Sequence, residues 1–559
     1  MDKEVRALLR RVLLDGLALA AVGIPLLVFK LWGQPYQRGF FCNDESLQHP
    51  FHDSTVTSEM LYVTGFVIPI AIFFGTEVRR KRQGCRAVGA RPLPLWLWET
   101  YRVVGVFLFG AACSQLTTDI GKYTIGRLRP HFLQLCQPNI DCSLAENRHV
   151  YHEAFECTNA FVDAYRLKEV RLSFPSGHSS FSAYTMVFLV IYVQVRWTRH
   201  RIFTLLRPFV QFLALSLAWF TALTRVSNYK HHWSDVLVGS LQGTIVAILI
   251  PYLAARGAPI HCQSAACGMA QLVGFLGSSV LVDWTILLAE GAAVLLVPLL
   301  SSAKRRGFSC SDTSIRQPYV EETIPTWALG VGFVVGALLL MVLFELMMSE
   351  TGPSGVVCRG RALPVWAVRL YSVVTAFLCG AGFSQMTTDI AKYHIGALRP
   401  HFFQVCQPNV SCDENVDPFR FYGPGDYRCT HWTEEQLADS RLSFPSGHAS
   451  LSFYVSTYLA FYLQSRVRDC SNERRLACFL VRPLVQGLAL LAAWFTAVSR
   501  VMDNMHHWRD VTAGALIGIV AAILIIQSLK PFKDVRCLRP NEESPLRRLQ
   551  ANGLDLERN

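Results

Sequence analysis

The sequence predicts an all-α polytopic membrane protein built from two parallel six-helix repeats, with about twelve transmembrane helices in all. Three observations support this prediction. Of the 559 residues, 51% are hydrophobic and 17% are charged, whereas an ordinary soluble protein has about 25% charged residues. The apolar residues come in blocks long enough to cross a bilayer as helices. The second half of the chain also repeats the motifs of the first half.

Each predicted span is an apolar block bounded by polar residues. In the first half the blocks are 16–32, 61–74, 103–113, 181–195, 209–223 and 236–253. In the second half they are 280–300, 327–348, 368–383, 451–463, 483–498 and 511–526. With flanking residues, each block approaches or reaches the ~17–25 residues that a transmembrane helix needs. Buried helices of a large soluble protein would not keep their charges confined between such blocks.

Basic residues in short loops predict the orientation. They gather near the N-terminus, in the segment 77–86 and in the segment 196–207. By the positive-inside rule these segments face the cytosol. The loops 33–57, about 122–177 and 225–235 then lie outside it. We expect a multi-pass protein of the plasma membrane or an endomembrane, with both termini in the cytosol. The net charge of +12 does not indicate nucleic-acid binding, because the basic residues lie in these loops.

Four motifs recur in the same order in the two halves, as in a duplicated unit. The pairs are 38–44 with 306–312, 117–123 with 387–393, Arg171–His178 with Arg441–His448, and His231–Asp235 with His506–Asp510. The third pair is identical in sequence. An even number of spans in each repeat makes the copies parallel. The predicted division is a first six-span repeat at 1–262, a junction at 263–279, a second six-span repeat at 280–530 and a polar cytosolic tail at 531–559.

Cysteines in the loops predicted outside the cytosol match between the repeats. They are Cys42, Cys136, Cys142 and Cys157 in the first repeat and Cys310, Cys406, Cys412 and Cys429 in the second. This pattern favours disulfides in an oxidising compartment, with free thiols as the alternative. Four cysteines allow three pairings, and the sequence does not choose among them. An N-glycosylation sequon at Asn409 lies in one of these loops.

Three polar clusters fall at the predicted external ends of spans, once in each repeat. In the first repeat they are Lys122 with Arg129, then Ser176, Gly177 and His178, then Arg225, His231 and Asp235. In the second repeat they are Lys392 with Arg399, then Ser446, Gly447 and His448, then Arg500, His506 and Asp510. One cluster alone is as well explained by basic side chains that reach the membrane interface, or by a helix start. Three duplicated clusters on one membrane face indicate a functional site.

These residue types suit the binding and transfer of a phosphoryl group. One Lys and two Arg side chains can hold a dianion, and the guanidinium fork matches phosphate oxygens. Small residues before a span leave backbone N–H groups free at a helix N-terminus, which also binds anions. His231 is expected to be a nucleophile that Asp235 orients, and His178 a general acid. The nearby cations disfavour a metal held by His231, His232 and Asp235, so we expect neither metal nor cofactor.

The pattern Lys-x6-Arg-Pro, Pro-Ser-Gly-His and Ser-Arg-x5-His-x3-Asp resembles that of the type 2 phosphatidic acid phosphatase superfamily. The segments 38–46, 122–131 and 229–236 look like the lipid phosphate phosphatases of animals, so the chain resembles a tandem duplication of such a unit. The resemblance runs through nearly all of both repeats. It implies six spans per unit, a site at the outer leaflet or lumen, no metal, and a phosphohistidine intermediate.

The resemblance also implies roles for individual residues. The nucleophiles would be His231 and His506, oriented by Asp235 and Asp510, and the general acids would be His178 and His448. The phosphate-binding residues would be Lys122, Arg129, Ser176, Gly177, Arg225, Lys392, Arg399, Ser446, Gly447 and Arg500. The implied substrates are lipid phosphomonoesters in the bilayer: phosphatidate, lysophosphatidate, sphingosine 1-phosphate or ceramide 1-phosphate.

Two departures from the pattern, and two rival functions, bear on this interpretation. Members of the family normally carry one unit, and Thr224 stands where the pattern has Ser, although it keeps the hydroxyl. A catalytically inactive or half-active lipid-binding signalling protein of the same family would lack a signature His or Lys, and neither copy does. A transporter with two parallel halves would carry its charges near the midplane of the membrane. We expect each site to form within its own repeat, and the sequence leaves a homo-oligomer open.

Overall fold

The structure, a computed structural model, describes most of the chain in segments. These are residues 3–79, 85–88, 91–142, 144–148, 150–197, 205–256, 276–347, 353–358, 361–412, 421–430, 433–467 and 475–528. The predicted tail at 531–559 and most of the predicted junction at 263–279 lie outside these residues, and the domain boundaries stay a prediction.

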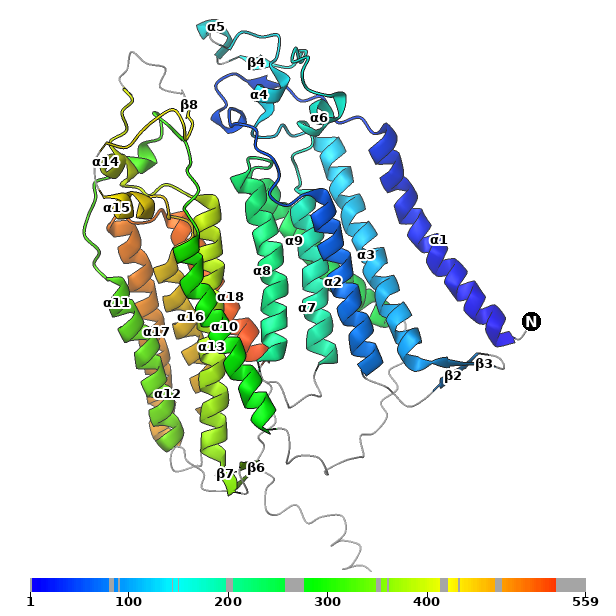
Figure 1. The fold of residues 1–559 in the computed structure, drawn as a ribbon, viewed down its shortest axis with the longest axis vertical. Helices are drawn as coiled ribbons and strands as arrows, with labels where there is room; N and C mark the ends of the chain where they lie inside the picture. Colours follow the sequence, from blue (N-terminus) through cyan, green and yellow to red (C-terminus); the bar gives the residue numbers. More distant parts are fainter. Residues whose placement is uncertain are drawn as a thin grey trace, which may run out of the picture.

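The first repeat contains six long helices that run up and down through the molecule (Figure 1). They are α1 (Lys3–Trp32), α2 (Ser58–Arg79), α3 (Leu95–Ile125), α7 (Gly177–Arg196), α8 (Leu206–Ser227) and α9 (Trp233–Arg256). The helix α7 lies at the centre of this repeat, since it packs against α2, α3, α8 and α9.

The second repeat is built in the same way. Its long helices are α10 (Leu276–Leu300), α13 (Val365–Ile395), α16 (Gly447–Val467), α17 (Arg475–Met502) and α18 (Trp508–Ser528). The remaining span is a continuous rod made of α11 (Thr326–Leu329), the π-helical η3 (Gly330–Val335) and α12 (Gly336–Met347). Here α16 takes the central place, against α13, α17 and α18.

The helices confirm the prediction of an all-α membrane protein with about twelve spans. Within the described segments, 11 helices are long and apolar enough to cross a membrane. The predicted span at 451–463 corresponds to α16, which has the length but carries several serines and tyrosines. These side chains, among them Tyr454 and Ser450, are buried inside the repeat. A central helix that faces other helices can carry polar groups that a lipid-facing helix cannot.

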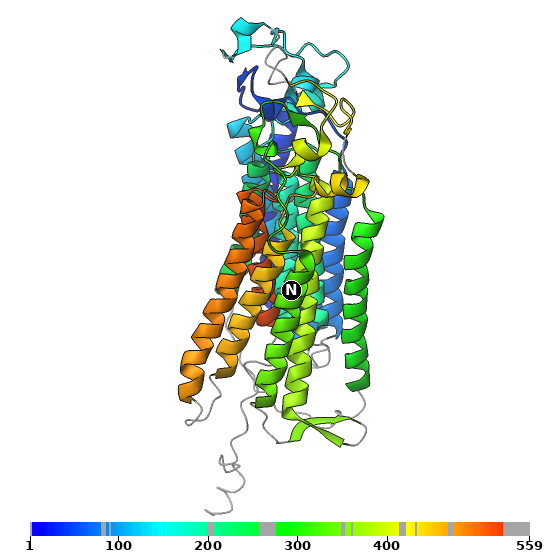
Figure 2. The same cartoon turned by 90° about the vertical axis from the view of Figure 1, so that its left-hand side faces the viewer.

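Short elements gather at the two ends of the helices (Figures 1 and 2). At one end lie η1 (Glu45–Leu47), α4 (Phe132–Cys136), α5 (Ala145–Arg148), α6 (Ala164–Glu169), η2 (Thr313–Ile315), α14 (Phe402–Cys406) and α15 (Glu434–Asp439). The same end holds the antiparallel pairs β1 (Phe40–Phe41) with β4 (Tyr151–His152) and β5 (Phe308–Ser309) with β8 (Phe421–Tyr422). At the opposite end lie the antiparallel pairs β2 (Cys85–Val88) with β3 (Arg91–Pro94) and β6 (Pro353–Cys358) with β7 (Arg361–Pro364).

Disulfides hold the loops at the α4 and α14 end of the molecule. The eight cysteines that the sequence singled out are paired as Cys42–Cys142, Cys136–Cys157, Cys310–Cys412 and Cys406–Cys429. The pairing is the same in the two repeats, so each repeat ties the first of its loops at this end to the second.

The two repeats contact each other through α8. This helix packs against α13, α10 and α18 of the second repeat. The rings of Phe212 and Phe383 stack with their centroids 3.7 Å apart. The indole N–H of Trp219 donates to the Thr387 carbonyl oxygen at 3.3 Å. The halves are therefore packed directly on each other.

Candidate active site

The first polar cluster forms where α3 ends. Lys122 lies in the last turn of α3, and Gly126 ends the helix with a left-handed φ of 57°, which favours glycine. The chain then turns back, and the backbone N–H of Arg129 donates to the Val170 carbonyl oxygen at 2.8 Å. The Nε atom of Arg129 is buried and has no hydrogen-bond partner among the described residues. One carboxylate, that of Glu169, lies 3.7 Å from the Arg129 guanidinium.

The second cluster forms the first turn of α7. The Ser176 hydroxyl caps this helix, and the Ser176 backbone N–H donates to the Asp235 carbonyl oxygen at 3.0 Å. Lys122 reaches the same turn, because a Cβ added at Gly177 would lie 3.2 Å from its Nζ atom. A Cβ added at Gly239 of α9 would lie 2.5 Å from the Ser176 carbonyl oxygen. Glycine at that position therefore lets α9 pack against the turn.

His231 lies in the short connection between α8 and α9 and is buried. Its Nδ1 atom is 2.7 Å from the Ser173 carbonyl oxygen, so Nδ1 carries the hydrogen and the lone pair of Nε2 is left free. Burial first, and then Arg129, Lys122 and His178, hold the pKa of His231 well below its ordinary value. These groups therefore surround one point, where a neutral imidazole can act as a nucleophile.

Asp235 does not hydrogen-bond to His231, which corrects the direct contact that the spacing predicted. Its carboxylate accepts from the Ser173 hydroxyl at 2.6 Å and from Arg127 at 2.5 Å. It also accepts from the backbone N–H of His232 at 3.2 Å. The two residues do not lie one helical turn apart, because α9 begins only after His232. The Asp235 carboxylate binds the Ser173 hydroxyl, and the Ser173 carbonyl oxygen binds Nδ1 of His231. Asp235 therefore acts on His231 through Ser173, as a positioning residue.

The second repeat reproduces this relay. His506 Nδ1 is 2.6 Å from the Ser443 carbonyl oxygen. The Ser443 hydroxyl donates to the Asp510 carboxylate, also at 2.6 Å. Burial first, and then Arg399 and Lys392, hold the pKa of His506 well below its ordinary value. The direct contact predicted between Asp510 and His506 is corrected in the same way.

The two predicted general acids lie in the first turns of α7 and α16. His448 Nε2 is 3.0 Å from the Ile324 carbonyl oxygen. The Nε2 atom of His178 is buried, and no partner within the distance and angle limits of a hydrogen bond is found for it among the described residues.

The remaining predicted phosphate-binding residues are buried at the same end of the helices. Arg225 and Arg500 lie in the last turns of α8 and α17, and each is 1% exposed. Ser446 and Gly447 begin α16 as their counterparts begin α7, and a Cβ added at Gly447 would lie 3.6 Å from Lys392 Nζ. The structure therefore brings all the predicted catalytic and binding residues together, in two separate sets.

Sequence reasoning missed several residues of the site. Ser173 and Ser443 carry the contact between the aspartate and the histidine, although both lie in the identical segment that marks the repeat. That identity was a usable signal. Lys230, which directly precedes His231, is 7% exposed. Burial first, and then Arg129, lower the pKa of Lys230 to about 8, so this ammonium group lies close to the cluster.

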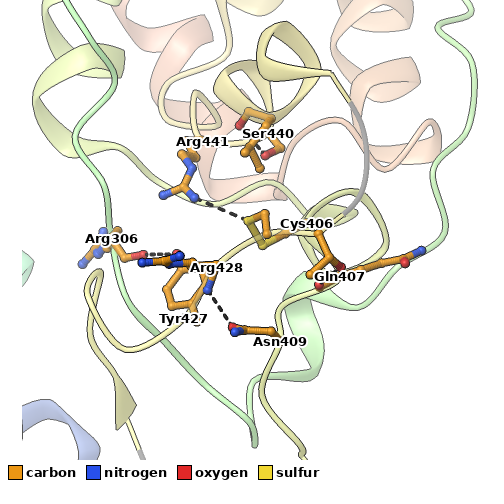
Figure 3. The surroundings of a disulfide bond; sticks show 11 residues. Arg306, Cys406, Gln407, Asn409, Tyr427, Arg428, Ser440 and Arg441 are labelled. Atoms are coloured by element: carbon orange, nitrogen blue, oxygen red, sulfur yellow. Dashed lines mark hydrogen bonds between the residues drawn. A yellow bond between two sulfur atoms is a disulfide. The ribbon is translucent and has the colours of Figure 1, made fainter.

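A disulfide-bonded loop lies beside the second site, and Figure 3 shows the surroundings of its Cys406–Cys429 bridge. The guanidinium of Arg441 contacts Cys429 Sγ of the Cys406–Cys429 disulfide at 3.7 Å. The backbone N–H of Arg399 donates to the carbonyl oxygen of the adjacent Ser440 at 2.8 Å. The loop thereby helps to hold Arg399 in place.

Asn409 lies in the same loop and is exposed. Its side-chain oxygen accepts from the backbone N–H of Arg428 at 2.7 Å (Figure 3). Glycosylation of Asn409 stays a prediction.

No group of three or more His, Cys, Asp and Glu side chains with the geometry of a metal site is found among the described residues. The side chains that surround His231 and His506 are instead cationic, which suits an anionic ligand.

Comparison with known proteins identifies the family of the chain. The PAP2 superfamily is matched twice, over residues 103–257 and 373–534. A putative phosphatidate phosphatase of Drosophila melanogaster is 51% identical over 265 residues, which cover 45% of this chain and 69% of that protein. Phospholipid phosphatase 1 of Rattus norvegicus is 41% identical over 248 residues, covering 43% of this chain and 83% of the relative. Phospholipid phosphatase 2 of Homo sapiens is 43% identical over 248 residues, covering 43% and 80%. No solved structure matches the chain.

Proposed function

The chain belongs to the PAP2 superfamily and is a lipid phosphatase of that family, and we propose that each of its two repeats holds a complete, metal-independent active site. The observation that carries the proposal is the environment of His231 and His506. Each histidine is held through Nδ1 by a serine carbonyl, and each is buried among a lysine, an arginine and a second histidine. Both repeats keep every one of these side chains.

The first chemical step is attack on phosphorus by the free Nε2 atom of His231. The Nε2–P bond forms as the bond between phosphorus and the lipid oxygen breaks. His178 donates a proton to that leaving oxygen, so the lipid departs as a neutral alcohol. Lys122, Arg129 and Arg225 stabilise the charge on the equatorial phosphoryl oxygens, with the backbone N–H groups at the start of α7.

The second step reverses the roles around the phosphohistidine. A water molecule attacks phosphorus, and His178 takes its proton as a general base. The N–P bond breaks, which releases phosphate and returns His231 to its neutral form. In the second repeat, His506 and His448 perform the same steps with Lys392, Arg399 and Arg500.

The place of the sites supports an amphiphilic substrate. Both sites lie at the ends of helices that are long and apolar enough to cross a membrane. A phosphate headgroup can therefore reach the site while its acyl chain stays in lipid. We propose phosphomonoesters of this kind as substrates: phosphatidate, lysophosphatidate, sphingosine 1-phosphate or ceramide 1-phosphate.

The disulfides support an orientation with both sites outside the cytosol. All four bridges lie in the loops at the active-site end, and such bonds persist in oxidising compartments. The clusters of basic residues in the alternate loops point the same way. We propose that the sites are extracellular or luminal and that both termini are cytosolic.

Nucleophile variants test the proposal. Phosphate release from phosphatidate in detergent micelles is measured for His231→Ala, His506→Ala and the double variant. Each single variant should keep part of the activity. The double variant should lose several orders of magnitude, because removal of a nucleophile generally costs that much.

Gel filtration of each purified variant shows whether it remains folded. With labelled phosphatidate, rapid quenching should trap an acid-labile, base-stable phosphoenzyme in either single variant and none in the double variant. A folded double variant that retains activity would refute the mechanism. Complete loss in one single variant would leave one catalytic repeat and one inactive repeat.

A further inference from the structure

The two sites differ in what surrounds the arginine at the end of α8 or α17. In the first site the Arg225 guanidinium contacts only neutral groups within the described residues. It donates to the Val56 carbonyl oxygen at 3.0 Å, to the Thr224 hydroxyl at 3.1 Å and to the Ser54 hydroxyl at 3.4 Å. The charge of this arginine is therefore not compensated by a neighbouring carboxylate.

In the second site the equivalent arginine is held by two carboxylates. Arg500 Nη2 lies 2.9 Å from Asp503 Oδ2, and Arg500 Nη1 lies 3.4 Å from Glu322 Oε1. Asp503 is fixed in place, because it also accepts from the backbone N–H and the hydroxyl of Thr323 at 2.9 and 2.7 Å. The corresponding residues of the first repeat, Asn228 and Ser54, carry no charge.

A third difference lies directly before the nucleophile. The first site has Lys230, whose ammonium group lies over the Phe51 ring, 3.7 Å from its centroid. The second site has Met505 in this place, and its Sδ atom is 3.2 Å from Arg399 Nη1. The first site thus gains a buried cation that the second site replaces with a neutral thioether.

The other cations of the motifs are matched between the sites. Arg129 is paired with Glu169 and Arg399 with Asp439, and each site has one lysine at the end of its third span. Arg127, which is paired with Asp235, has Ala397 as its counterpart, and Arg509 lies beside Asp510 instead.

When only the lysine, the two arginines, position 230 or 505 and the ion-pair partners of the two arginines are compared, the first site has four cations and one carboxylate, and the second has three cations and three carboxylates. The charge of Asp53 also acts on Lys230. A phosphate dianion that enters the second site must compete with Asp503 and Glu322 for Arg500.

We infer that the two sites have unequal affinity for a phosphate dianion and that the first site binds it more tightly. The difference is set by the residues at 54, 228 and 230 and by their counterparts at 322, 503 and 505. The inference rests on the proposed function of both repeats. Coulomb interactions between buried or half-buried groups a few ångströms apart are large enough to change affinity by about tenfold or more.

Two single-site proteins test the inference. His506→Ala leaves only the first site active, and His231→Ala leaves only the second. The inhibition constant of inorganic orthophosphate is measured for each, with the KM for a short-chain phosphatidate. We expect orthophosphate to inhibit the first site at a concentration lower by about tenfold or more than the second.

Charge exchange shows whether the named residues are responsible. In the second-site protein, Glu322→Ser with Asp503→Asn should tighten orthophosphate inhibition toward the value of the first site, and Met505→Lys should tighten it further. In the first-site protein, Ser54→Glu with Asn228→Asp should weaken inhibition, as should Lys230→Met. Asp426→Asn is the matched control, because it removes an exposed carboxylate from the disulfide-bonded loop of the second repeat without touching Arg500.

The outcomes separate this inference from the proposed function. If neither single-site protein hydrolyses phosphomonoesters, the proposed function fails. If both single-site proteins hydrolyse phosphomonoesters, two outcomes overturn the inference and leave the proposed function standing. One is equal orthophosphate inhibition constants for the two sites, and the other is charge exchanges that leave these constants unchanged. A silent second site that Glu322→Ser with Asp503→Asn reactivates would support the inference, and one that stays silent in folded protein would contradict it. If the exchange in one repeat does not fold, the reciprocal exchange in the other repeat decides.

Discussion

Lys304, in the second repeat, donates hydrogen bonds to Asn228 of the first repeat, at 3.2 Å to Oδ1, and to the carbonyl of the adjacent Ser227. Asn228 begins the connection that carries His231, the proposed nucleophile. The Arg306 guanidinium also lies over the Tyr229 ring of this connection. The second repeat therefore contacts the connection that precedes His231, although the predicted residues of the first site all come from the first repeat.

The support is not reciprocal in the contacts described. Asp503, the counterpart of Asn228, is held by Thr323 and Arg500 of its own repeat. Lys304→Met should therefore raise the KM of the first site by roughly threefold to tenfold, because it removes the ammonium donor from the Ser227 carbonyl and the Asn228 side chain. The measurement is phosphatidate hydrolysis in the His506→Ala protein, and the same substitution in the His231→Ala protein should have little effect. Equal effects on both sites would contradict a local role for Lys304.

Asp235 should affect the rate of the reaction more than the binding of phosphate. Asp235→Asn, in the His506→Ala protein, weakens the hold on Ser173 and so loosens the His231 imidazole. Loss of such a supporting contact commonly costs about 10–100-fold in activity. We expect kcat to fall by that order while the orthophosphate inhibition constant changes little. A parallel rise of the inhibition constant would indicate general damage to the site instead.

Lys230 should give the first site a pH dependence that the second site lacks. The pKa of Lys230 is lowered to about 8, chiefly by burial and then by Arg129. Below this pH the ammonium group attracts the phosphate dianion, and above it the charge is lost. The kcat/KM of the first site should therefore fall as the pH rises through about 8.

The profile of kcat/KM against pH in the two single-site proteins checks this. Lys230→Arg should remove the decline, since arginine stays charged over the whole range. A decline of the same shape in the second-site protein, which has Met505 at this position, would assign it to another group.

Activity should survive removal of divalent metal ions. The phosphoryl group is expected to meet Lys122, Arg129 and Arg225, which provide the positive charge that a metal supplies in other phosphoryl-transfer enzymes. Phosphate release is measured before and after dialysis against EDTA. Loss of most activity in EDTA, with recovery on addition of magnesium, would contradict the mechanism.

The paired cysteines should be protected from thiol reagents in intact cells. A membrane-impermeant maleimide should label the eight loop cysteines only after reduction, because all are bonded in pairs. Mass spectrometry of peptides that contain Cys136 or Cys406 reads out the result. Labelling without a reductant would show free thiols. Protection after reduction in intact cells would place the loops either in the cytosol or in the lumen of an internal membrane.

The sequence by itself determined where the spans lie, that the chain contains a repeat, and which residues make up the two candidate sites. Spans can be read from composition because a helix satisfies its backbone hydrogen bonds within the segment, which the bilayer requires. The motifs around His231 and His506 could be recognised because both copies keep the same residue types at the same spacing. These properties are local to each segment, so no knowledge of packing was needed.

Only the tertiary structure decided which distant residues touch. It paired the cysteines, placed Ser173 between Asp235 and His231, and set α8 against α13. It also brought Glu322, in the connection before α11, to Arg500 in the last turn of α17, although the two lie far apart in the chain. Such contacts depend on how helices pack and where loops cross between them. The residues that distinguish the two sites are therefore visible in the sequence, but their effect on a buried arginine follows only from the fold.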